Sequence, residues 1–172
     1  IGDWAADAQA VIEAVTEGPL ILVGSSMGGW IATLLTRRLG ARVAGFVGIA
    51  AAPDFTEDGF WAGFSDEERD KVTTEGVTYL PSAYGDPYAV TKRLIEDGRD
   101  NLVLRAPLPM AVPVRLMQGT EDEAVTRETA LRLLDHIEGD DVQLCFVKGA
   151  DHRFSEPANL AMIEAAIVEV GG

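Results

Sequence analysis

The residues with the clearest chemical potential lie near the start of the chain. An apolar run, residues 20–23, leads directly into Gly24-Ser25-Ser26-Met27-Gly28, and apolar residues at helical spacing follow. A Gly-x-Ser-x-Gly turn between a strand and a helix is typical of a nucleophile elbow, in which the serine backbone is strained and small neighbours at Gly24 and Gly28 relieve crowding. The alternative is an ordinary glycine-rich connection. The elbow interpretation predicts that the Ser26 hydroxyl points outward and can attack a carbonyl carbon.

The serine would need a base, because a serine hydroxyl is a weak nucleophile near neutral pH. The chain has two histidines, His136 and His152. His136 ends an amphipathic stretch, residues 126–137, where a histidine interacts favourably with the helix dipole. His152 follows a strand-like run, residues 142–147, and a short loop, so we expect it at the carboxyl edge of a parallel sheet, where reactive groups gather. We therefore predict His152 as the base.

A carboxylate should complete this arrangement, on a loop after another strand and between the serine and the histidine in sequence. Residues 112–117 alternate as a strand does, and three consecutive acids follow them, Glu121, Asp122 and Glu123. Asp122 is preferred because it lies three residues after Gly119 and three before Val125, the spacing at which such loops present the acid. The other two acids are expected to be solvated neighbours, since charges in a run usually face solvent.

Together these motifs resemble the α/β-hydrolase superfamily of serine hydrolases. The similarity is carried by residues 24–29, by the acid loop, residues 118–125, and by the histidine loop, residues 149–154, in the superfamily's order. Residues 24–52 and Asp151-His152-Arg153 are most similar to small bacterial esterases related to a mitochondrial acyl-protein thioesterase that also cleaves acyl glucuronides. The resemblance implies a three-layer α/β/α fold with a mostly parallel sheet, and it requires no cofactor.

The resemblance also implies a role for each site residue. Ser26 would be the nucleophile, His152 the general base and then the general acid, and Asp122 the group that fixes the imidazole tautomer and stabilises the imidazolium. The implied mechanism is acyl transfer to Ser26, followed by hydrolysis of the acyl-enzyme. One donor to the oxyanion should be the backbone N–H of Met27. The loop that usually supplies the second donor, often marked by His-Gly, is not found before Ser26.

The elements that must position these residues are four predicted strands, residues 20–24, 43–50, 112–118 and 142–148. One amphipathic helix, residues 3–17, precedes the first strand, with an apolar stripe formed by Trp4, Ala8, Val11, Ile12 and Val15. The superfamily places several strands ahead of such a helix, and the chain begins with Ile1. We therefore expect residues 1–172 to be a single domain that is partial at its amino terminus. The missing half, attached or as a separate fragment, would then pair with the open edge of the nucleophile strand.

A lid is predicted over residues 53–109, because this segment does not continue the alternation of strands and helices and insertions of that length are usually functional. Ser65-Asp66-Glu67-Glu68 is a capping box that opens a helix toward Glu75, and Pro87 should open a second helix, residues 88–97.

Aromatic residues are concentrated in the same segment, at Phe55, Phe60, Trp61, Phe64, Tyr79, Tyr84 and Tyr88. Most are expected to hold the lid together by packing. We predict that Trp61 and Phe64 line an acyl pocket.

Composition limits the partners. The chain has 172 residues, 47% of them hydrophobic, and a net charge of -14. This length and hydrophobic content are enough for one domain with a sizeable core. Nucleic acids and anionic membranes require clustered cations, so the acidity argues against both. No apolar run is long enough to span a membrane, and no cysteine and histidine cluster has the spacing of metal ligands.

The single cysteine, Cys145, excludes a framework of intrachain disulfides and favours a reducing, cytoplasmic location. Its place in the middle of a predicted strand indicates a small buried hydrophobic residue rather than a reactive thiol.

The preferred functional hypothesis is a carboxylic-ester hydrolase acting on small to medium acyl groups. An acyl-thioesterase is the nearest alternative, because the same three residues cleave both bonds. A dehalogenase or epoxide hydrolase of this superfamily would carry aspartate in place of Ser26, whereas a carbon–carbon hydrolase or a perhydrolase could use the serine. A non-catalytic binding module on the same scaffold is the alternative from another class.

Overall fold

The computed structural model describes residues 1–82 and 85–172 and divides the chain into two compact units. The sheet unit contains residues 3–53 and 103–172, and the insertion unit contains residues 1–2 and 54–102. The larger segment of the insertion unit, residues 54–102, falls within the predicted lid, residues 53–109. A lid function for it stays a prediction.

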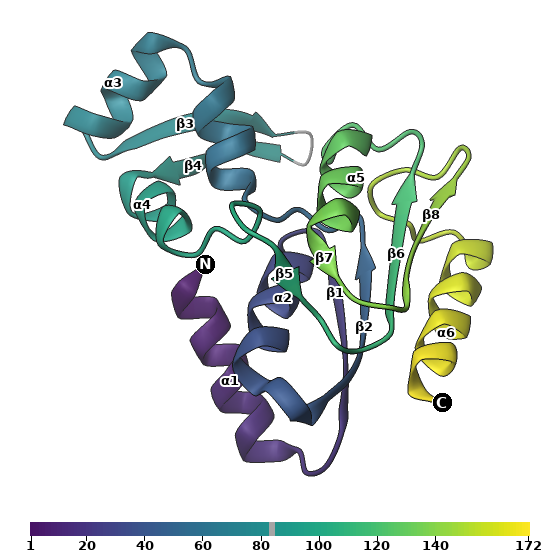
Figure 1. Ribbon diagram of the computed structural model, residues 1–172. Helices are drawn as coiled ribbons and strands as arrows, with labels where there is room; N and C mark the ends of the chain where they lie inside the picture. The colour runs from purple at the N-terminus through teal and green to yellow at the C-terminus, as the bar shows by residue number, and fades with distance from the viewer. Residues whose placement is uncertain (83–84) are drawn as a thin grey trace. The chain divides into compact units, whose positions relative to one another are not determined.

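Four parallel strands form the sheet of the sheet unit, in the order β1-β2-β6-β8 (Figure 1). They are β1 (Leu20–Ser25), β2 (Val43–Ile49), β6 (Val114–Gly119) and β8 (Val142–Val147). Each predicted strand is confirmed to within two residues. Strands β2 and β6 lie in the middle and are almost entirely buried, as expected of continuous apolar runs in a parallel sheet.

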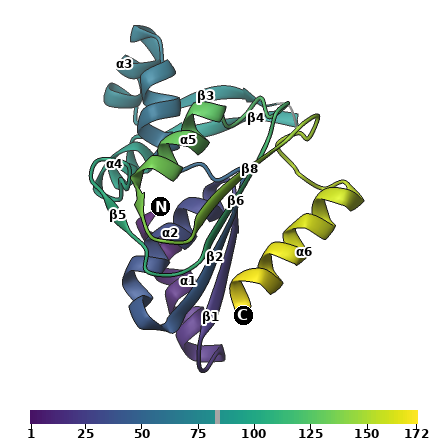
Figure 2. The same ribbon diagram turned by 45° about the vertical axis from the view of Figure 1, so that its right-hand side comes forward.

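Helices cover both faces of this sheet. The helices of the sheet unit are α1 (Gly2–Val15), α2 (Met27–Leu39), α5 (Arg127–His136) and α6 (Pro157–Gly171). Helices α2 and α5 lie on one face and α6 lies on the other (Figure 2), which gives the predicted three-layer architecture. A short 3-10 helix η1 (Gly40–Arg42) precedes β2, and a separate parallel pair joins β5 (Leu108–Pro109) to β7 (Ile137–Glu138). None of the helices in the described part of the chain is long and apolar enough to cross a membrane.

The apolar stripe of the first helix is largely exposed. Helix α1 forms, but Ala5 is its one buried residue, and Trp4, Val11 and Val15 are 46%, 59% and 73% exposed. Amphipathic spacing gives the side of a helix that can be buried, whereas burial also needs a partner, and the described residues place none over these side chains. Strand β1 is likewise an edge strand of the described sheet. Its pairing with an amino-terminal segment stays a prediction.

The expectation that Cys145 is buried is wrong. The thiol is exposed, and no residue of β8 is fully buried. Strand β8 is the other edge of the sheet, with a neighbour on one side within the described residues, so its side chains are covered less than those of β2 and β6. The cytoplasmic location inferred from the cysteine stays a prediction.

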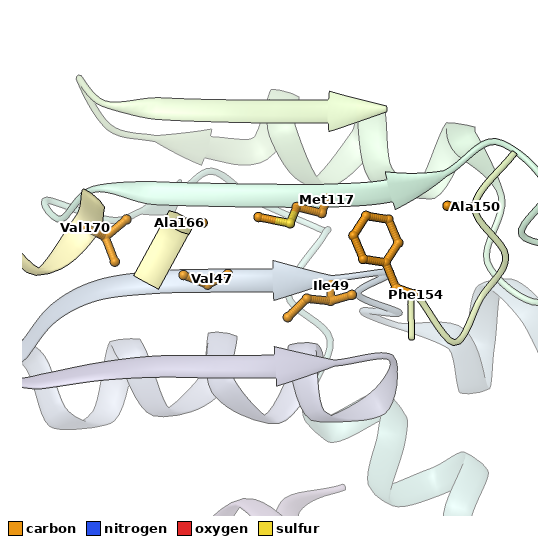
Figure 3. Packing of buried hydrophobic residues seen from close by; sticks show 7 residues of the cluster. All are labelled: Val47, Ile49, Met117, Ala150, Phe154, Ala166 and Val170. Carbon is orange, nitrogen blue, oxygen red and sulfur yellow. The ribbon is translucent and has the colours of Figure 1, made fainter. Parts of the chain in front are cut away.

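One cluster in the core joins the sheet to the histidine loop (Figure 3). Strand β2 contributes Val47 and Ile49, β6 contributes Met117, and helix α6 packs over them. Phe154, from the loop after β8, is completely buried in this cluster. The loop that carries His152 is therefore anchored in the core of the sheet unit.

The insertion unit contains a π-helix η2 (Thr56–Trp61), helices α3 (Asp66–Thr74) and α4 (Lys92–Asp100), and an antiparallel hairpin of β3 (Val77–Ser82) and β4 (Gly85–Thr91). The predicted capping box is confirmed at α3. Ser65 Oγ accepts a hydrogen bond from the Glu68 N–H at 3.2 Å, and the Glu68 carboxylate accepts one from the Ser65 N–H at 2.7 Å.

The second predicted helix, residues 88–97, is wrong over its first half. Residues through Thr91 belong to β4, and α4 begins at Lys92 with Thr91 as its N-cap. What makes this segment a strand is its antiparallel pairing with β3, in which Tyr88 lies opposite Leu80 and Val90 opposite Thr78. Tyr84, one of the aromatic residues expected to pack here, lies outside the described residues.

Candidate active site

Ser26 occupies a tight turn between β1 and α2. Its backbone has φ 53° and ψ -124°, a conformation that residues with a side chain rarely adopt. Three hydrogen bonds hold it there: the Ser26 N–H donates to the Ile49 carbonyl at 2.9 Å, and the Ser26 carbonyl accepts from the N–H groups of Gly29 at 2.9 Å and Ala52 at 3.0 Å. The end of β2 therefore fixes the strained turn.

Gly24 and Gly29 are the positions of this turn where no side chain fits. A Cβ on Gly24 would lie 2.3 Å from the Gly28 carbonyl oxygen, and one on Gly29 would lie 2.5 Å from Ala51 Cβ. A Cβ on Gly28 would meet nothing within 4 Å among the described residues. The prediction that small neighbours relieve crowding is thus confirmed for Gly24 and wrong for Gly28.

The Asp122 side chain is completely buried and saturated with hydrogen bonds. Oδ1 accepts from the backbone N–H groups of Val125 at 2.8 Å and Ala124 at 2.9 Å. Oδ2 accepts from His152 Nδ1 at 2.9 Å and from Gln118 Nε2 at 2.8 Å. Burial alone would raise the pKa of Asp122, but these four hydrogen bonds outweigh it and hold the pKa below the usual value. The carboxylate is therefore ionised at neutral pH.

His152 is held by the residues that flank it. Asp151 Oδ1 accepts from the N–H groups of Arg153 and Phe154, both at 3.1 Å, which closes a turn around the histidine. Phe154 has a φ of 52°, and its ring belongs to the cluster with Ile49 and Met117 at the ends of β2 and β6 (Figure 3). The His152 side chain itself is 24% exposed, so the ring can meet a substrate.

The acid loop and the histidine loop are also tied directly to each other. Thr120 Oγ1 accepts from the Gly149 N–H at 2.9 Å, and the Glu121 N–H donates to the Ala150 carbonyl at 3.0 Å. At Gly119 the two loops approach so closely that a Cβ would lie 2.2 Å from the Ala150 oxygen. Only glycine allows this contact without a shift of backbone.

Ser26, His152 and Asp122 form one hydrogen-bonded row. Ser26 Oγ lies 3.1 Å from His152 Nε2, and His152 Nδ1 lies 2.9 Å from Asp122 Oδ2. Because an ionised carboxylate can only accept, the imidazole proton resides on Nδ1 and Nε2 accepts from the serine hydroxyl. Such a row can move a proton from the hydroxyl to the imidazole as the oxygen attacks a carbon. The neighbouring acids Glu121 and Glu123 are exposed.

The model of the alpha/beta hydrolase family matches residues 1–163. The chain belongs to this family. A curated relative, the mitochondrial palmitoyl-protein thioesterase of Bos taurus, is 31% identical over 168 residues, which are 95% of this chain and 54% of the relative. The chain spans about half the length of the curated relatives it matches.

Two solved structures are similar along almost the whole chain. An Agrobacterium vitis S4 protein described as a hydrolase has 39% sequence identity and a TM-score of 0.93, covering 97% of this chain and 67% of its own. The alpha/beta hydrolase domain-containing protein 10 from mouse has 31% identity and a TM-score of 0.89, covering 98% of this chain and 68% of its own.

In this alpha/beta hydrolase, Met27 is the first residue of α2. The first N–H groups of a helix have no acceptor inside the helix, and the helix dipole favours negative charge beside them. The Met27 N–H therefore suits an oxyanion formed at Ser26. The described residues contain no group of three or more histidine, cysteine or acidic side chains placed to hold a metal ion.

The second histidine of the chain lies at a helix end, as predicted. His136 is the last residue of α5, and its Nδ1 lies 2.7 Å from the Arg132 carbonyl oxygen of the same helix. The ring thus caps its own helix, on a different element from the site.

Trp61 and Phe64 make aromatic and cation–π contacts within the insertion unit. The Arg99 guanidinium lies 4.5 Å from the Trp61 ring centre, and Phe64 meets the same indole edge-on at 6.1 Å. Phe64 is only 5% exposed, in a cluster with Val72, Val90 and Ile95. These contacts account for both residues as packing. Their predicted contact with a substrate stays a prediction.

Two residues that shape the hydrolase site were not predicted. Gln118 and Phe154 act on Asp122 and on the His152 loop respectively. The available signal for Gln118 was a polar residue at the end of an otherwise apolar strand, and for Phe154 a large aromatic residue two positions after the histidine.

Proposed function

We propose that the protein is a serine hydrolase that cleaves carboxylic esters of small to medium acyl groups through an acyl-enzyme on Ser26. The observation that carries this proposal is the hydrogen-bonded row from Ser26 Oγ through His152 to Asp122, in which each distance is within 3.1 Å. The negative charge of the buried Asp122 carboxylate stabilises the imidazolium that forms when His152 accepts a proton.

The reaction begins when His152 Nε2 takes the proton of the Ser26 hydroxyl while Oγ bonds to the ester carbonyl carbon. The carbonyl oxygen becomes an oxyanion, which accepts a hydrogen bond from the Met27 N–H. Protonated His152 then gives its proton to the leaving alkoxide as the carbon–oxygen bond breaks. A water molecule, deprotonated by His152, attacks the acyl-enzyme, and Ser26 Oγ leaves with the proton returned by the ring.

Asp122 acts throughout this cycle without being protonated. Its Oδ2 holds the proton of His152 on Nδ1, which keeps Nε2 facing Ser26, and its charge stabilises the imidazolium that forms in both steps.

An acyl-thioesterase is the second candidate. It is favoured by the name of the curated relatives, palmitoyl-protein thioesterase, at 31% identity over 95% of this chain. The chemistry at Ser26 is the same, since only the leaving group changes from an alkoxide to a thiolate.

Labelling with a fluorophosphonate probe tests the nucleophile. The natural protein should be labelled, and Ser26→Ala should lose both labelling and hydrolysis of p-nitrophenyl butyrate, the latter by at least about 10⁴-fold. Ser25→Ala is the matched control, because Ser25 is the exposed neighbouring serine and should leave labelling intact. A natural protein that takes up no probe would instead support a non-catalytic binding module.

Paired substrates separate the two candidate activities. Butyryl and palmitoyl groups should each be offered as an oxygen ester and as a thioester of the same alcohol or thiol skeleton. A higher kcat/KM for the butyryl oxygen ester supports the esterase. A higher kcat/KM for the palmitoyl thioester, also lost in Ser26→Ala, would replace it with the thioesterase.

A further inference from the structure

Gln118 is a buried polar side chain for which the reaction steps above have no use. It is the penultimate residue of β6, and 1% of its surface is exposed. An amide group in the interior lowers stability unless its polar atoms are hydrogen-bonded. Its presence at the end of an apolar strand therefore calls for an explanation.

The surroundings of this amide determine its orientation. Nε2 donates to Asp122 Oδ2 at 2.8 Å and to the Val125 carbonyl at 3.1 Å, and lies 3.5 Å from the Gly119 carbonyl. All three are acceptors, so the nitrogen and not the oxygen must face them. Oε1 has no hydrogen-bond partner among the described residues.

The two oxygens of Asp122 are held in different ways. Oδ1 is fixed by two backbone N–H groups of its own loop, whereas Oδ2 has two side-chain partners, His152 and Gln118. Without Gln118, the direction of Oδ2 would depend on the same imidazole that it has to orient. Gln118 gives Oδ2 a second hydrogen-bond donor, which is carried by the buried strand β6.

We propose that Gln118 is a positioning residue, whose amide N–H directs Asp122 Oδ2 toward His152 Nδ1 and takes up part of its negative charge. This inference rests on the proposed function, because Gln118 acts through Asp122 and His152 and touches no reacting atom.

The test compares Gln118→Met, which has similar length and volume and no donor, with the natural chain. With the donor lost, the charge on Oδ2 faces His152 alone and stabilises the protonated ring. The titration midpoint of the His152 ring should therefore move upward by roughly half a pH unit. The other charged residues of the two loops, Glu121, Glu123, Asp151 and Arg153, are exposed and unchanged in the variant.

Nuclear magnetic resonance can follow this titration directly, because the chain has only two histidines. His136 lies on α5 and should titrate identically in both proteins, as an internal control. The acid limb of kcat/KM for p-nitrophenyl butyrate should shift in the same direction, with kcat lowered about tenfold and KM unchanged, since positioning acts on the reaction step.

A second variant separates positioning from general loss of a buried hydrogen bond. Thr36→Val removes the buried hydrogen bond from Thr36 Oγ1 to the Ala32 carbonyl, on helix α2. It should lower the thermal midpoint without moving the His152 titration. Gln118→Asn keeps an amide but shortens it, and should shift the titration as Gln118→Met does.

An unchanged His152 midpoint in both Gln118 variants overturns the inference, whatever happens to their thermal stability. If the His152 midpoint shifts but the natural protein shows no Ser26-dependent turnover, the proposed function fails while the link from Gln118 to the imidazole stands.

Discussion

The glycine at the crossing of the two loops gives the sharpest prediction about the site. Gly119→Ala would place a Cβ 2.2 Å from the Ala150 carbonyl oxygen and 2.8 Å from that of Asp151. An ordinary contact begins at 3.4 Å, so the loops must separate by about 1.2 Å. Both obstacles are backbone atoms, which cannot rotate away as a side chain does. The displaced segment leads directly into His152.

This displacement is too large for the hydrogen bonds of His152 to survive unchanged. His152 reaches Asp122 at 2.9 Å and Ser26 at 3.1 Å, so a shift of this size would break at least one of the two hydrogen bonds. A misplacement of about 1 Å lowers catalytic rates roughly 10²-fold, and forcing extra atoms into a packed interior lowers stability by about 1–3 kcal/mol. We expect kcat/KM for p-nitrophenyl butyrate to fall about a hundredfold, with a reduced free energy of unfolding.

Gly63→Ala is the matched control for this experiment. A Cβ at Gly63 meets nothing within 4 Å among the described residues, and its φ needs no glycine. Kinetics and urea denaturation should be measured on both variants. Natural kcat/KM in Gly119→Ala would refute the argument that the close approach of the loops sets the geometry of the site.

Further predictions concern the anchors of the fold. Phe154→Ala should lower the free energy of unfolding in urea by about 3–5 kcal/mol, because the ring is completely buried; a loss below about 1 kcal/mol would contradict its anchoring role. The pKa of Asp122 is lowered in the folded state, so its contribution to stability is complete above the ordinary value of about 3.9 and is lost as the pH falls through the folded value. The thermal midpoint should therefore fall more steeply below about pH 4 in the natural chain than in Asp122→Asn, and parallel curves would argue against this linkage. Glu169→Gln removes one of the two acidic partners of Arg115, both of which are about half exposed. Because salt screens exposed ion pairs, the difference in thermal midpoint between the variant and the natural chain should be smaller in about 500 mM NaCl than in about 20 mM NaCl. A difference independent of salt would show that the pair is not screened.

Chemistry at the carboxyl edge of the sheet could be predicted because it depends on local pattern. Apolar runs identified the strands, and the residues just after β1, β6 and β8 then had to lie at one edge. The contact from Ser26 through His152 to Asp122 follows from that topology.

What could not be predicted depends on neighbours distant in sequence. Cys145 is exposed because its strand lies at an edge, which the strand's own residues do not specify. The same is true of the exposure of Trp4 in α1, since amphipathic spacing does not specify what covers the apolar stripe. Residues 88–91 extend as a strand rather than the helix that Pro87 suggested, because they pair with β3, a partner that their own sequence does not specify.

The row at the site joins contacts of very different sequence span. His152 and Asp122 are 30 residues apart, whereas His152 and Ser26 are 126 apart. For flexible chains, closing the longer loop costs about 1.3 kcal/mol more in entropy than closing the shorter one. The acid and base belong to one local segment of the chain, but the hydroxyl reaches them only when the distant strands have assembled. Under the proposed function, catalytic turnover would therefore report complete folding, since a chain with His152 and Asp122 paired and its sheet incomplete would not have Ser26 in place.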